Sequence, residues 1–213
     1  MTPDTLTQLI AKIQAQLLDN ATLFTTATVT AAVRQALADI NLAAPQLMGI
    51  TMAGVAGQKE YELEDELATG IFDVLLQGSG DTDYSLTYYA FVEDGRHWFR
   101  LRNPQPSTAT LIVRYTLPHT INGLDGATES TFSDELNVAA LNGSVYYCCL
   151  VRSAATIESN NVAPGVPVNW IKLADVWHER FLDSLHRART DPPARGEPAR
   201  STWEDAQHST IYP

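Results

Sequence analysis

The hydrophobic period changes twice along this chain, and the change limits the folds that it can form. Near both ends, apolar residues recur every three or four positions, which is the spacing of one face of a helix. Between residues 47 and 117 they alternate instead, and glycines become frequent, as in antiparallel strands. The pattern predicts an α+β protein with an antiparallel β domain inserted between helical segments.

The helical segments predict four helices that pack as a bundle. The first two cover residues 3–19 and 28–42, and Pro45 ends the second. Two amphipathic helices joined by a short loop usually pack antiparallel as a hairpin. The third helix covers 133–150 and is apolar all round in its second half, which predicts burial on several sides, and the fourth covers 168–188.

The region between helices two and three predicts a set of short strands. Asp94-Gly95 suits a tight hairpin turn, because this pair tolerates a positive φ. The best strand candidates are residues 47–55, 71–77, 84–92, 96–102 and 109–117. The chain then divides into an N-terminal helical hairpin (1–46), the inserted β domain (47–130), C-terminal helices that complete the bundle (131–188) and an extended C-terminal arm (189–213).

Composition excludes several classes of protein. The 213 residues hold 25 acidic and 14 basic side chains, a formal net charge of −11, which disfavours a nucleic-acid binder. Neither a secretory signal nor an apolar run long enough to span a membrane is evident, so we expect a soluble protein made in a reducing cytoplasm. Cys148 and Cys149 are adjacent and read as core residues. With no enzymatic or metal-binding motif found, we expect no catalysis and no cofactor.

An acidic run stands out at the start of the β domain. It consists of Glu60, Glu62, Glu64, Asp65 and Glu66. Burying more than one of these carboxylates is costly, so the run predicts a solvated edge. Two alternatives stay open: a patch that meets a basic partner or repels DNA, and a hydrolase site, which requires one carboxylate with a strongly perturbed pKa.

The C-terminal 25 residues have a different character. They are rich in proline and arginine, and alone they cannot offset the entropy lost on ordering. Apolar anchors near their end predict an arm that folds onto a partner. The candidate partner-binding residues are Arg187, Arg189, Arg195, Arg200, Trp203, Ile211 and Tyr212.

In its order of elements the chain resembles the head-to-tail adaptor (connector, or head-completion) proteins of tailed bacteriophages. The β region opens with Gly57-Gln58-Lys59-Glu60-Tyr61-Glu62-Leu63, similar to the Gly-Gln-x-x-Tyr-x-Leu-Pro stretch of that family, although Glu64 replaces the proline. A helix ending near paired tyrosines and a tryptophan-rich last helix follow in the expected order. The resemblance covers about residues 5–188.

The resemblance implies a virion structural protein without catalysis. Such proteins form a ring, typically a dodecamer, in the neck between the portal and the tail or its terminator, and DNA passes through without specific binding. The acidic run would then line the channel or an interface, and the arm would grip the portal or a neighbouring subunit. One alternative is a carbohydrate- or receptor-binding module of a virion, with Trp98, Tyr88 and Tyr89 as stacking platforms, although strand alternation places at least one of these in the core.

Overall fold

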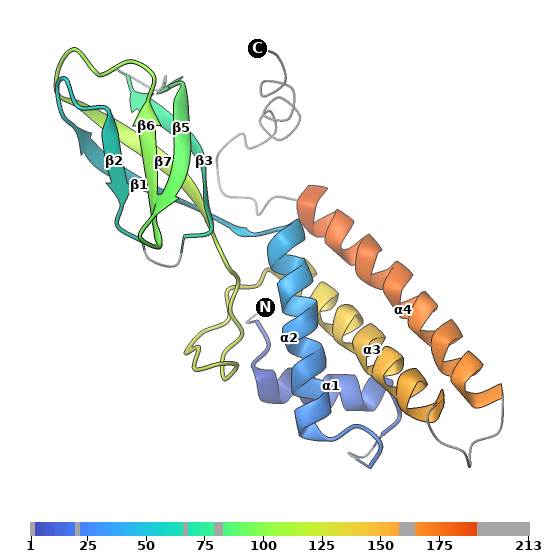
Figure 1. Cartoon of the computed structure of the whole chain (residues 1–213). Helices are drawn as coiled ribbons and strands as arrows, with labels where there is room; N and C mark the ends of the chain where they lie inside the picture. Colours follow the sequence, from blue (N-terminus) through green and yellow to red (C-terminus); the bar gives the residue numbers. More distant parts are fainter. Residues whose placement is uncertain (1–2, 20–21, 66–67, 79–82, 158–164, 191–213) are drawn as a thin grey trace. The chain divides into compact units, whose positions relative to one another are not determined.

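A computed structural model of the chain describes residues 3–19, 22–65, 68–78, 83–157 and 165–190 (Figure 1). Within these ranges the protein is α+β, with four helices and two antiparallel sheets. The helices are α1 (Leu6–Gln16), α2 (Thr26–Ala43), α3 (Asp134–Ile157) and α4 (Gly165–Thr190). The strands are β1 (Gln46–Gly54), β2 (Glu60–Leu63), β3 (Gly70–Gln77), β4 (Asp83–Ser85), β5 (Tyr88–Glu93), β6 (Arg96–Leu101) and β7 (Ala109–Leu117).

The chain separates into two compact units. The helical unit contains α1, α2 as far as Ala36, α3 and α4. The β unit runs from Leu37 to Thr131 and contains all the described strands together with the end of α2. The chain therefore leaves the helical unit within α2 and returns to it just before α3.

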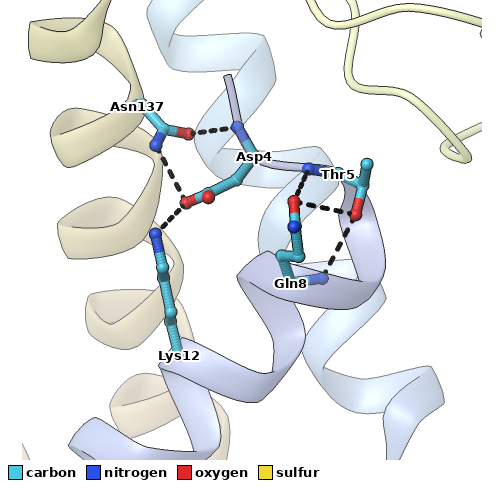
Figure 2. A network of polar contacts seen from close by, with 5 residues as sticks. All are labelled: Asp4, Thr5, Gln8, Lys12 and Asn137. Atoms are coloured by element: carbon cyan, nitrogen blue, oxygen red, sulfur yellow. Dashed lines mark hydrogen bonds and ion pairs between the residues drawn. The ribbon is translucent and has the colours of Figure 1, made fainter. Parts of the chain in front are cut away.

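A polar network ties the start of α1 to α3 (Figure 2). Thr5 caps α1: its side chain accepts a hydrogen bond from the Gln8 backbone N–H, and its own backbone N–H donates to Gln8 Oε1 at 2.9 Å. Asp4 Oδ2 accepts hydrogen bonds from Lys12 Nζ at 2.6 Å and from Asn137 Nδ2 at 2.8 Å. The residue before the cap thus attaches α1 to α3.

Gly143 lies where three helices approach closely. It is buried in α3, which runs side by side with α4 (Figure 1). A Cβ atom on Gly143 would lie 2.9 Å from Cε2 of Phe181 in α4 and 3.0 Å from Cβ of Ala36 in α2. These separations are shorter than normal contacts between carbon atoms, so the site fits a residue without a side chain.

The β unit consists of two small antiparallel sheets. One has the order β1-β7-β3-β4 and the other β2-β6-β5. Only two residues separate β4 from β5, so the chain passes from one sheet to the other there. Buried side chains from both sheets, together with Ala68 from the segment between β2 and β3, form one core: Tyr61, Leu63, Ala68, Val74, Phe99, Leu101, Leu111, Val113 and Tyr115.

Most predicted elements are confirmed, with changed boundaries. The first helix is shorter than predicted, because Thr5 caps it and Leu18, just after its end, has a φ of 51°. The third helix continues to Ile157. The predicted strand 84–92 is divided into β4 and β5, and β2 was not predicted at all. The division into four parts at residues 46, 130 and 188 stays a prediction.

His119 links three segments of the β unit. Its backbone N–H donates to Asn41 Oδ1 at 2.6 Å, and its Nε2 lies 3.0 Å from the carbonyl oxygen of Ala44. A carbonyl oxygen only accepts, so Nε2 carries the proton. In the neutral ring, Nδ1, which lies 3.1 Å from Thr131 Oγ1, accepts a hydrogen bond from that hydroxyl. The burial of the imidazole favours this neutral form.

We expect His119 to make the stability of the protein pH-dependent. Burial lowers its pKa below 6.5, and hydrogen bonds to the backbone of Ala44 and of Thr131 oppose this shift only in part. Below pH 6.5 the unfolded state therefore binds more protons than the folded state, so this contribution is complete above pH 6.5 and is lost as the pH falls toward the folded-state pKa. Its slope is at most about 1.4 kcal/mol per pH unit.

Urea unfolding between pH 5 and pH 8 measures this effect. His119→Gln should unfold with a smaller dependence on pH than the natural protein, whatever its absolute stability. Comparing slopes rather than levels separates titration from the lost hydrogen bonds. Equal slopes for the two proteins would contradict the prediction.

Candidate interaction surfaces

The acidic run begins on an edge strand. β2 contains Glu60 and Glu62, and among the described strands it pairs only with β6. Tyr61 and Leu63 alternate with these glutamates and are buried in the core. The run therefore has two faces: an apolar one that holds the strand in place and an acidic one that points away from the core.

Arginines of β6 neutralise part of the acidic face. Arg100 Nε donates to Glu60 Oε1 at 2.7 Å, and Arg96 forms an ion pair with Glu62. The register explains both pairs, because Glu60 lies directly opposite Arg100, and Arg96 precedes the residue opposite Leu63. The prediction of a simple solvated acidic edge was therefore too coarse, since this edge alternates in charge.

The remaining acidic residues differ from one another. Asp65 is half-buried and accepts a hydrogen bond from the Tyr115 hydroxyl at 3.0 Å, whereas Glu64 is exposed. The Tyr115 pKa is raised by burial and by this hydrogen bond with the Asp65 carboxylate. Glu66 lies outside the described residues. Whether the run forms a channel or interface patch stays a prediction.

The candidate arm residues fall into two groups. Arg187 and Arg189 lie in the last turn of α4, where positive charge is favourable near the helix C-terminus. Arg187 Nη2 also donates to Asp183 Oδ2, one turn earlier, at 2.6 Å. Arg189 lies in α4, which continues to Thr190, and the role of Arg187 and Arg189 in partner binding stays a prediction. Arg195, Arg200, Trp203, Ile211 and Tyr212 lie outside the described residues.

Three aromatic side chains meet on the outer face of the β2-β6-β5 sheet. The Phe91 ring stacks with Trp98 at 6.4 Å and with Tyr89 at 6.1 Å, and the Arg100 guanidinium lies 5.9 Å from the Phe91 centroid. Tyr88 points the other way and meets Phe99 of the core edge-on. Tyr88 is therefore partly buried against the core, whereas Tyr89 and Trp98 lie beside Phe91 on the outer face. Carbohydrate binding by this face stays a hypothesis.

β1 is a candidate interaction surface that the sequence reasoning missed. It is nine residues long, carries no charge and occupies the edge of its sheet. Six of its nine residues are exposed, and they lie on both faces of the strand. Among them are Leu47, Met48 and Ile50, with 46%, 38% and 37% of their surface accessible. A long uncharged edge strand readily pairs with a strand of another chain.

The two cysteines and the possible metal ligands of the described residues were compared with what a redox or metal site requires. Cys148 and Cys149 are free and buried in α3, and burial raises the pKa of each thiol to about 12. Such thiols are protonated and unreactive at neutral pH. In the described part of the chain, no group of three or more His, Cys, Asp or Glu side chains is placed to hold a metal ion. No described helix is both long and apolar enough to cross a membrane.

Comparison with known proteins gives weak structural likenesses. No protein-family model matches the chain, and no curated protein matches it. One similar solved structure is the neck of an empty GTA particle computed with C6 symmetry, at 14% identity and a TM-score of 0.31, covering 79% of this chain and 87% of the other. A second is the neck of a native GTA particle computed with C12 symmetry, at 15% identity and a TM-score of 0.28, covering 93% and 100%.

Proposed function

We propose that this protein is a structural component of a virion neck. Copies of the chain form a ring, in our proposal a dodecamer, that joins the portal to the tail or its terminator and lets DNA pass through without specific binding. The ring subunit has a four-helix bundle, an inserted β domain and a C-terminal arm, and it acts by packing rather than by catalysis. Its site of action is the virion, after synthesis in the host cytoplasm.

One observation carries the assembly role: β1 is an uncharged nine-residue edge strand with apolar side chains in solvent. Proteins that act alone usually protect such an edge with charges, prolines or a covering segment. The virion neck in particular is supported by the resemblance to phage head-to-tail adaptors. The described elements follow that order: two helices, strands, then two long helices.

The neck role is tested by disrupting the gene in the particle that encodes it. We expect DNA-filled or DNA-leaking heads without attached tails, and restoration of tailed particles when the gene is supplied in trans. Electron microscopy of the particles, with the protein labelled, should place it between head and tail. Tailed particles of normal appearance in the absence of the protein would overturn the proposal.

A further inference from the structure

The open edges of the two sheets differ in how they are protected. β4 is only three residues long, and β2 carries Glu60 and Glu62, so both are poor templates for pairing. β1 has no charged residue, and β5 has one, Glu93 at its end. Within the described ranges, β1 and β5 each pair with a single strand and leave one edge open.

β5 also exposes apolar surface beside its open edge. Tyr89 and Val92 have 67% and 60% of their surface accessible. Both are residue types that favour strands, so this edge is well suited to pair with another strand. β1 exposes Leu47, Met48 and Ile50 in the same way. The β unit thus presents two unprotected edges, one on each sheet. Pairing these edges would place no like charges opposite each other, because β1 has no charged residue and β5 has only Glu93.

We infer that β1 of one copy pairs with β5 of the next copy, so that the two sheets continue across the subunit boundary. The six residues of β5 allow up to six residue pairs along the nine of β1. Because the two edges are different surfaces, the contact is head-to-tail, and repetition closes a ring when the rotation permits. This inference rests on the proposed ring and identifies the surfaces that build it.

Cysteine cross-linking of the purified full-length protein tests the contact. Thr51 on β1 and Val92 on β5 are exposed, whereas the two natural thiols are buried, with a pKa of about 12. With a short bismaleimide at pH 7, T51C/V92C should give a ladder of dimers, trimers and larger species. T51C alone, V92C alone and T51C/S107C, whose second cysteine lies on an exposed loop, should not.

Each other result overturns the inference. Dimers from T51C alone would mean that β1 pairs with itself, and an equal ladder from T51C/S107C would mean random collision. Absence of any cross-linked species would mean that the edges do not meet. As a second readout, Thr51→Lys should weaken self-association by about tenfold or more, and Ser107→Lys should not. These measurements need neither portal nor particle, so they can fail while the neck role stands, and the reverse also holds.

Discussion

Replacing Gly143 with alanine is expected to lower the free energy of unfolding by about 1–3 kcal/mol, as overpacking of a core does. In an exposed helix the same change would be stabilising by up to about 1 kcal/mol. The sign reverses here because the new Cβ atom would lie 2.9 Å from Cε2 of Phe181 and 3.0 Å from Cβ of Ala36. Relief requires movement of α4 or α2, since the Ala36 Cβ has no other rotamer. Urea unfolding followed by helical circular dichroism measures the change.

A double variant identifies the cause. Phe181→Leu removes ring atoms that the new Cβ would meet, so Gly143→Ala should cost less in the Phe181→Leu background than in the natural protein. Ala154 is exposed in α3, so Ala154→Gly measures how much a glycine–alanine exchange changes the free energy of unfolding through helix propensity alone. A neutral or stabilising Gly143→Ala would show that the three helices are not this close.

The helices could be predicted from the sequence because apolar residues at helical spacing are the residues that the helices bury. Leu9 and Ile13 of the first helix, which are four positions apart, are both fully buried. Their ends were harder to place. The start of α1 depends on the Thr5–Gln8 capping box, and α3, which packs against α4, continues past the apolar segment to Ile157.

The acidic run shows why one strand was missed. Tyr61 and Leu63 alternate with Glu60 and Glu62, which is the pattern of a half-buried strand, but the density of carboxylates favoured a solvated segment. Tyr61 and Leu63 hold the strand in the core, and Arg96 and Arg100 of β6 offset part of the charge of its glutamates. Those partners follow from the strand register, and a single sequence does not determine the register.

The exposed edge of β1 was unpredictable for a similar reason. Residues 47–55 were predicted as a strand, and nearly all of them form one. Their alternation of apolar and small residues gives no sign that the strand stands at an edge. That position follows from the strand order β1-β7-β3-β4, in which the first and last strands of the β unit in sequence pair with each other. The absence of charge in this strand was the one signal that sequence reasoning could have used.

Deleting residues 191–213 is expected to reduce docking on the portal by about a hundredfold or more, if the arm holds two anchors of ordinary hot-spot strength. Trp203 and Tyr212 are the expected anchors, because aromatic side chains contribute most to such contacts. The truncation keeps every described helix and strand, so the unfolding transition should be unchanged. Binding of the purified protein to immobilised portal rings measures the loss.

Point variants distinguish the contribution of the aromatic anchors to docking from the effect of removing the whole segment. Trp203→Ala and Tyr212→Ala should each weaken docking, whereas Ser201→Ala and Gln207→Ala should not. Arg187→Ala and Arg189→Ala test the last turn of α4, which remains in the truncated protein. Cross-linking between β1 and β5 should persist after truncation, because both edges belong to the β unit. Undiminished docking would remove the arm from portal binding, and loss of the cross-links would mean that the arm, rather than the two edges, joins the copies.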